Sequence, residues 1–93
     1  METQQLRHEL KVLLVQRLRL RDVAPDTIRD DDPLSEGPLG LDSLDLLELA
    51  LAVDQAYGVK LPDEQLAQRA LHTIAALAEF VQRSQAAQGV ARS

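Results

Sequence analysis

Residues 41–58 read LDSLDLLELALAVDQAYG, and this stretch decides how the rest of the chain is interpreted. Asp42 and Ser43 are residue types that begin helices well, because their side-chain oxygens accept hydrogen bonds from the free N–H groups of the first turn. Gly58 suits the left-handed backbone conformation that ends many helices. The pattern therefore predicts a helix over residues 43–57.

This predicted helix carries more leucine than one helix face buries. Spacings of three, four and seven residues place its apolar side chains in two stripes that point in different directions around the axis. The first stripe is Leu46, Leu49, Ala50, Val53 and Tyr57, and the second is Leu44, Leu47 and Leu51. We expect one stripe to face the core and the other to lie partly exposed beside Asp45, Glu48 and Asp54, as a docking surface for a basic, apolar groove. The alternative is that the second stripe packs beneath a long neighbouring loop.

The same periodicity predicts further helices at about residues 3–20, 63–69 and 73–84. The connection over residues 21–41 contains helix breakers and the apolar residues Val23, Ile28, Leu34, Leu39 and Leu41, which we expect to anchor it to the helices. No strand-like alternation is visible. The predicted fold class is therefore all-α: a small four-helix bundle with a long loop between helices 1 and 2 and a short third helix. We expect one domain over residues 1–84 and a flexible tail over residues 85–93.

The chain has 93 residues and a net charge of -5, which is unevenly distributed. Residues 22–64 hold twelve acidic and two basic side chains, whereas residues 1–21 and 65–93 are net basic. An acidic middle segment excludes binding to a phosphate backbone there and favours a basic protein surface, or serves solubility alone. We expect no nucleic-acid partner.

No apolar run approaches the roughly 20 residues of a membrane-spanning helix, and charges interrupt any N-terminal signal segment, so a cytoplasmic location is expected.

Few residues have the spacing of a catalytic or metal site. The chain has no cysteine, which excludes disulfides, thiolate metal ligands and a cysteine nucleophile. We interpret the acidic run at residues 30–32 as a solvated charge run, because it lacks EF-hand spacing, and His8 and His72 lack zinc-ligand spacing. Ser43 does not lie in a Gly-x-Ser-x-Gly nucleophile elbow, because residue 45 is Asp. We expect neither a metal nor catalytic turnover.

The string Gly40-Leu41-Asp42-Ser43-Leu44-Asp45, followed by Leu47-Glu48-Leu49 and by residues 57–64 (YGVKLPDE), resembles the acyl carrier protein family. The resemblance covers about residues 5–82. It is specific because the Asp-Ser-Leu core follows a long acidic loop and opens a leucine-rich acidic helix. It implies a four-helix bundle and a protein that is not an enzyme but a substrate and partner of biosynthetic enzymes.

The resemblance implies that Ser43 carries 4'-phosphopantetheine, transferred from coenzyme A by a phosphopantetheinyl transferase. The thiol of this arm holds acyl groups as thioesters, so a chain without cysteine gains its sulfur from the arm. The implied partners are ketosynthase, ketoreductase, dehydratase or acyl-ligase enzymes with basic docking surfaces, and the free carrier is expected to be a monomer. The residues that match the docking face of the family are Asp42, Leu44, Asp45, Leu47, Glu48, Leu51 and Asp54.

Some positions depart from the carriers of fatty-acid synthesis. Pro38 and Leu46 stand where many of those carriers have an acidic residue and a small polar residue. Together with Leu41 and residues 73–80 (TIAALAEF), they make the sequence most similar to carriers of type II polyketide or aryl-polyene pigment pathways. Asp42, where peptidyl carriers often have His, disfavours an amino-acid cargo.

A second hypothesis requires no covalent group. The chain is then a non-covalent acidic helical adaptor, which binds a basic partner through residues 43–57 and uses Ser43 only as a helix cap. The covalent state of Ser43 separates the two hypotheses.

Overall fold

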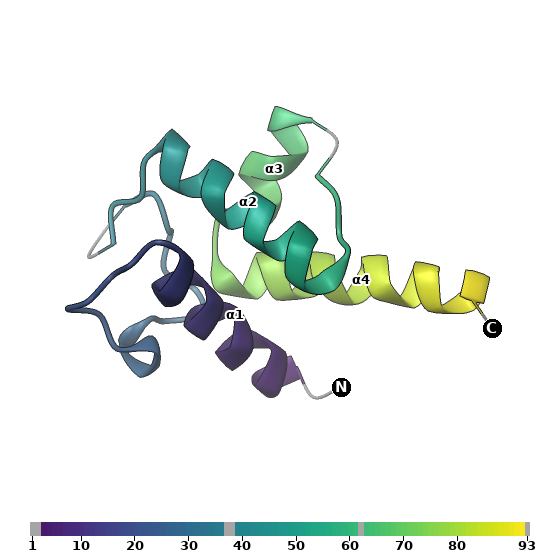
Figure 1. The fold of residues 1–93 in the computed structure, drawn as a ribbon, viewed down its shortest axis with the longest axis horizontal. Helices are drawn as coiled ribbons and strands as arrows, with labels where there is room; N and C mark the ends of the chain where they lie inside the picture. The colour runs from purple at the N-terminus through teal and green to yellow at the C-terminus, as the bar shows by residue number, and fades with distance from the viewer. Residues whose placement is uncertain (1–2, 37–38, 62, 93) are drawn as a thin grey trace.

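The computed structural model describes residues 3–36, 39–61 and 63–92, which form four α-helices and one 3-10 turn (Figure 1). The elements are α1 (Thr3–Arg17), η1 (Pro25–Thr27), α2 (Ser43–Tyr57), α3 (Glu64–Ala70) and α4 (Ile74–Arg92). The described residues contain no strand. The structure confirms the predicted all-α fold, with its long loop between α1 and α2 and its short third helix. Pro38 lies outside the described residues.

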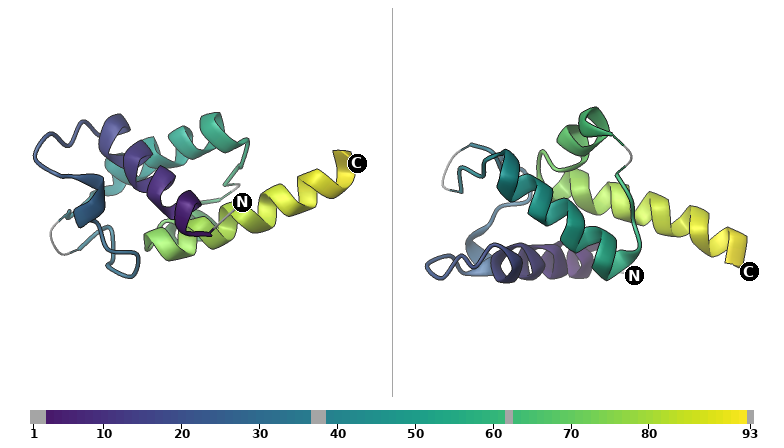
Figure 2. Two further views of the ribbon diagram at one scale, coloured as in Figure 1. Left: turned by 90° about the horizontal axis from the view of Figure 1, so that it is seen from below. Right: turned by 45° about the horizontal axis from the view of Figure 1, so that its top comes forward.

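The helices pack around a single core. α1 packs against both α2 and α4, and α3 packs against α4. Figure 2 shows the short α3 on the side of α2 away from α1. The C-terminal part of α4 extends beyond the other helices and contributes to the longest dimension of the molecule, 42 Å (Figure 1).

The bounds of α2 are those predicted, but α1 ends earlier than expected, at Arg17 instead of residue 20. Arg19 has a left-handed φ of 55°, and its N–H donates to the Gln16 carbonyl at 3.3 Å. The Leu20 N–H donates to the Val15 carbonyl at 3.0 Å, which completes a Schellman motif. Glycine usually occupies the position of Arg19, since other residues lose about 1–2 kcal/mol there. Partial burial of Leu20 and Val15 against the core helps to offset this cost.

The last helix differs from its expected bounds in the opposite sense. α4 continues to Arg92, past the expected end at residue 84. Residues 85–92 (QAAQGVAR) are mostly good helix formers and include no proline, so the helix continues through them despite the unfavourable Gly89. The Thr73 hydroxyl accepts a hydrogen bond from the Ala76 N–H at 3.0 Å, which confirms the expected N-cap. The flexibility of residues 85–92 stays a prediction, and Ser93 lies outside the described residues.

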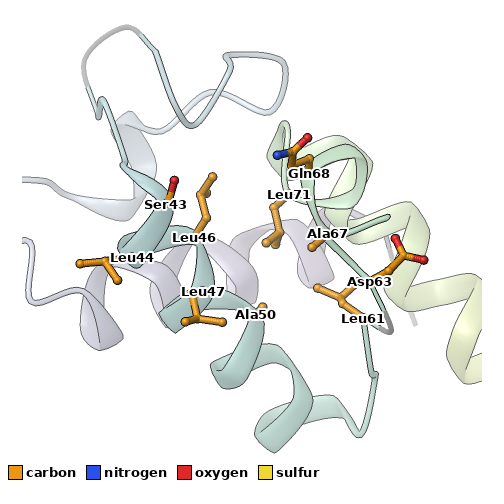
Figure 3. A pocket seen from close by; sticks show the side chains of 10 residues that line it. All are labelled: Ser43, Leu44, Leu46, Leu47, Ala50, Leu61, Asp63, Ala67, Gln68 and Leu71. Carbon is orange, nitrogen blue, oxygen red and sulfur yellow. The ribbon is translucent and has the colours of Figure 1, made fainter. Parts of the chain in front are cut away.

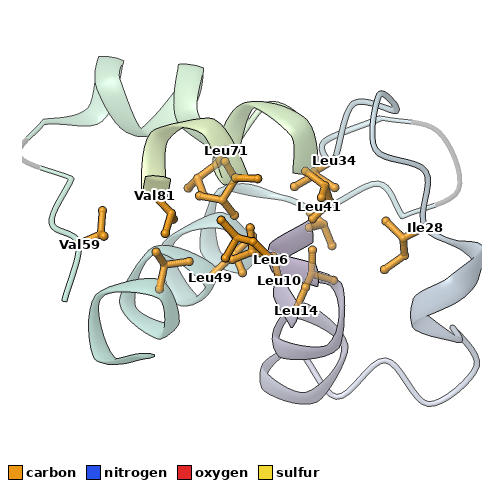
Figure 4. Close-up of a cluster of buried hydrophobic side chains, with 14 residues drawn as sticks. Leu6, Leu10, Leu14, Ile28, Leu34, Leu41, Leu49, Val59, Leu71 and Val81 are labelled. Atoms are coloured by element: carbon orange, nitrogen blue, oxygen red, sulfur yellow. The ribbon is translucent and has the colours of Figure 1, made fainter. Parts of the chain in front are cut away.

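The core combines one face of each long helix with anchors from the loop (Figure 4). Its fully buried large side chains include Leu6, Leu10 and Leu14 from α1, Leu49 and Val53 from α2, and Ile74, Leu77 and Val81 from α4. The loop contributes Ile28, Leu34 and Leu41, all buried, while Val23 and Leu39 are partly buried against the same cluster. The expected apolar anchoring of the loop is therefore confirmed.

Polar contacts at Asp30 also fix the loop. Its carboxylate lies 2.9 Å from the Arg7 guanidinium and 2.6 Å from the Lys11 ammonium, both on α1. Its backbone carbonyl accepts a hydrogen bond from the Ala75 N–H of α4. Contact with Lys11, opposed by partial burial and reinforced by Arg7, lowers the pKa of the Asp30 carboxyl. The interpretation of residues 30–32 as a purely solvated run is thus wrong for Asp30, which joins the loop to two helices.

The two leucine stripes of α2 predict different effects on stability. Replacement of the fully buried Leu49 by Ala should lower the free energy of unfolding by about 2–5 kcal/mol, through lost apolar burial and the cavity left behind. The matched change Leu47→Ala, at a side chain that is 57% exposed, should alter it by less than about 0.5–1 kcal/mol. Urea unfolding followed by far-UV circular dichroism measures both, and equal losses would contradict the assigned core.

Candidate functional site

A reciprocal pair of hydrogen bonds fixes the N-terminus of α2. The Asp42 carboxylate accepts from the Asp45 N–H at 2.9 Å, and the Asp45 carboxylate accepts from the Asp42 N–H at 3.3 Å. This is a capping box, with Asp42 as the N-cap. Before it, Gly40 has a φ of 52°, a left-handed value that glycine adopts without a steric penalty. The cap role that the sequence left open between Asp42 and Ser43 therefore belongs to Asp42.

Ser43 is the first residue of α2, and its side chain is exposed. Because Asp42 provides the cap, the Ser43 hydroxyl is not required for it, and it makes no hydrogen bond to other described residues. The first-turn N–H groups and the helix dipole together favour negative charge at this end of α2. The geometry therefore offers an accessible hydroxyl at a place that suits a phosphate.

The second leucine stripe of α2 is exposed. Leu44, Leu47 and Leu51 are 75%, 57% and 48% exposed. The loop does not cover them, so the alternative in which they pack beneath it is wrong. From the first stripe, Leu49 and Val53 are buried, while Leu46, Ala50 and Tyr57 are partly buried. Ala52 is also buried, although it belongs to neither predicted stripe.

The carboxylates along α2 have different partners. Asp42 and Asp45 bond to each other's backbone in the capping box. Glu48 lies 3.7 Å from Arg17 of α1, and Asp54 lies 4.0 Å from Lys60. At the far end of α2, the Tyr57 hydroxyl donates to Glu9 of α1 at 3.1 Å, and burial together with this carboxylate raises the pKa of Tyr57 to about 12.

A groove of about 480 Å³ runs between α2 and α3 and begins beside Ser43 (Figure 3). Leu46, Leu47 and Ala50 form its α2 side, and Leu61, Ala67 and Leu71 form much of the opposite side. Asp63 also lines it, and its carboxylate accepts from the Leu66 N–H as the N-cap of α3. The mostly apolar lining suits a hydrocarbon chain better than a charged ligand.

Sequence reasoning placed Leu46, Leu47 and Ala50, which form the α2 side of this groove, in its two stripes, but it did not predict the groove itself. The opposite side, formed by Leu61, Ala67, Gln68 and Leu71, was missed. Leu61 and Leu71 lie just outside α3 (Glu64–Ala70), so periodicity within that short helix does not identify them.

Comparison with known proteins gives the site a family context. The sequence model described as "Phosphopantetheine attachment site" matches residues 8–81. The chain is 31% identical over 74 residues to an acyl carrier protein of Sulfurovum sp., covering 80% of this chain and 91% of that protein. It is 43% identical over 60 residues to the anthracycline acyl carrier protein DpsG of Streptomyces peucetius, covering 64% of this chain and 69% of that protein.

An acyl carrier protein of Campylobacter hominis is 37% identical over 57 residues, covering 61% of this chain and 67% of that protein. These similarities span most of the helical domain and include both plain acyl carrier proteins and an anthracycline carrier. Among the described helices, none is both long and apolar enough to cross a membrane.

Proposed function

The chain belongs to the acyl carrier protein family, and we propose that Ser43 is its site of 4'-phosphopantetheine attachment. Members of this family carry the arm and have no catalytic activity of their own. The observation that carries the proposal is the exposed Ser43 hydroxyl at the first position of α2, left free by the capping role of Asp42.

The proposed transfer uses only the hydroxyl of this chain. A bond forms between Ser43 Oγ and the phosphorus of the arm, and the bond from that phosphorus to the adenosine bisphosphate half of coenzyme A breaks. The hydroxyl proton leaves to a base on the transferase. The phosphodiester then lies at the N-terminus of α2, where the helix dipole stabilises each negative charge by about 0.3–1 kcal/mol. The arm also supplies the thiol that this cysteine-free chain lacks.

Modification at Ser43 is directly testable. After incubation with coenzyme A and a broad-specificity phosphopantetheinyl transferase, intact mass spectrometry should show one added phosphopantetheine on the natural chain and none on Ser43→Ala. The matched variant Ser35→Ala, at an exposed serine of the loop, should be modified like the natural chain. An unmodified natural chain, or an addition that survives Ser43→Ala, would overturn the proposal and favour the non-covalent adaptor.

We also propose that the surface around Ser43 docks partner enzymes. The exposed leucines Leu44, Leu47 and Leu51 offer apolar area, and the neighbouring carboxylates Asp42, Asp45, Glu48 and Asp54 offer negative charge. Exposed ion pairs each contribute about 0–1 kcal/mol, so the carboxylates orient a basic partner more than they hold it. Burial of the leucines then supplies most of the affinity.

Replacement of one leucine tests the docking surface. Leu47→Gln keeps the side-chain size but loses the apolar contact, so we expect kcat/KM for the transferase to fall roughly tenfold, the scale of one buried apolar side chain. The control is Ala56→Gln, which places the same side chain at another exposed position of α2. Equal rates for both variants would show that Leu47 does not contact the transferase.

For the pathway, we propose a type II polyketide or aryl-polyene system in the cytoplasm, where the monomeric carrier meets ketosynthase, ketoreductase, dehydratase or acyl-ligase partners. Its similarity to anthracycline carriers supports the polyketide class. The cargo distinguishes the pathways: carrier isolated from its natural cells should bear oxygenated or polyunsaturated acyl groups on its arm, as measured by mass spectrometry of the released arm. Saturated, even-numbered chains alone would assign the carrier to fatty-acid synthesis instead.

A further inference from the structure

The carboxylates near Ser43 fall into two groups. Within the described residues, Asp42 and Asp45 have no cationic side chain at ion-pair distance, and their oxygens bond to backbone N–H groups. Glu48 and Asp54, farther along α2, each have a cation of this same chain beside them. The unpaired negative charge of the docking surface is therefore concentrated at the Ser43 end of the helix.

The partner of Glu48 is the more firmly held of the two cations. Arg17 Nε lies 3.7 Å from Glu48 Oε1, and Arg17 Nη2 donates a hydrogen bond to Gln55 Oε1 at 2.7 Å. Glu48 and Gln55 are seven residues apart, so they lie two turns apart on the same side of α2. The Arg17 guanidinium therefore bridges Glu48 and Gln55 on the side of α2 that faces α1. Leu51 lies between these two residues in sequence.

The cation beside Asp54 is held less firmly. Lys60 Nζ lies 4.0 Å from Asp54, and its side chain is 83% exposed, compared with 33% for Arg17. An exposed pair at that distance is screened by water and salt. Arg17, half-buried and held by two residues of α2, is therefore the cation with a defined position on this surface.

We infer that Arg17 is a specificity-determining residue, which neutralises Glu48 and so directs basic partners toward Asp42 and Asp45 beside Ser43. This inference rests on the proposed function, because it concerns the partners that dock there. A basic group of a partner gains less at Glu48 than at the first turn, since Arg17 already balances that charge and repels a second cation. The arrangement favours partners whose basic residues approach Ser43 over partners that rely on the middle of α2.

The test removes the cation and measures modification by the transferase, using the full chain. Arg17→Gln should raise kcat/KM about two- to fivefold at low salt, the scale of one exposed ion pair. The gain should largely vanish near 1 M salt, where the screening length is about 3 Å. Arg17→Lys, which keeps the charge, should stay near the rate of the natural chain.

Two controls identify the cause of any increase in kcat/KM. Arg29→Gln removes the same charge from an exposed position in the loop and should change the rate little. In the double variant Arg17→Gln with Glu48→Gln, the gain should disappear, because the freed carboxylate is then absent. If Arg17 had only a structural role, Arg17→Gln would instead lower the melting temperature and leave the rate of modification unchanged or lower.

The outcomes separate this inference from the proposed function. If the natural chain is not modified at Ser43, the proposed function fails and the inference fails with it. If the natural chain is modified but Arg17→Gln reacts no faster than Arg29→Gln, only the inference is overturned. A gain that persists in the double variant overturns it as well, because Glu48 is then not the group that Arg17 masks.

Discussion

The capping box between Asp42 and Asp45 is the constraint on which the rest of the site depends. By fixing the residue at which α2 begins, it fixes the direction in which every later side chain of that helix points. With this start, Leu49 and Val53 point into the core and Leu47 points outward. A start displaced by one residue would rotate the helix by about 100°, bring exposed leucines toward the core and carry Ser43 away from the groove. The free hydroxyl, the exposed stripe and the groove therefore share one local cause.

The fold explains part of the uneven charge distribution along the sequence. Basic side chains of the N-terminal segment lie beside acidic side chains of the middle segment, because α1 packs against the loop and α2. Arg7 and Lys11 of α1 contact Asp30, while Arg17 contacts Glu48. Part of the negative charge thus joins elements of the chain to one another. The remainder, nearest Ser43, stays available to a partner, so the number of acidic side chains in the middle segment overstates the negative charge that a partner meets.

Sequence reasoning predicted the features that depend on local chemistry. The bounds of α2 follow from cap residues and Gly58, and the burial of Ile28 and Leu34 follows from their apolar character within a polar loop. Sequence reasoning failed where packing against other parts of the fold determines the local structure. The end of α1 depends on the left-handed backbone conformation of Arg19, which two backbone hydrogen bonds and the packing of Leu20 stabilise. The residue types in this segment do not predict that conformation. Asp30 looked like its acidic neighbours, and only the packing of α1 against the loop distinguishes it.

The groove is another feature that depends on packing between elements, and it helps to explain why α2 carries so much leucine. A helix that only covered a core would need one apolar stripe, but α2 borders three environments: the core, the groove shared with α3, and solvent. Leu49 packs in the core, Leu46 and Ala50 line the groove, and Leu51 faces solvent. Leucine exposed to water gains nothing for folding, so its presence at Leu44, Leu47 and Leu51 is best explained by contacts made outside the fold. Because the second environment exists only once α3 is in place, periodicity within α2 alone could separate inside from outside but could not reveal the groove.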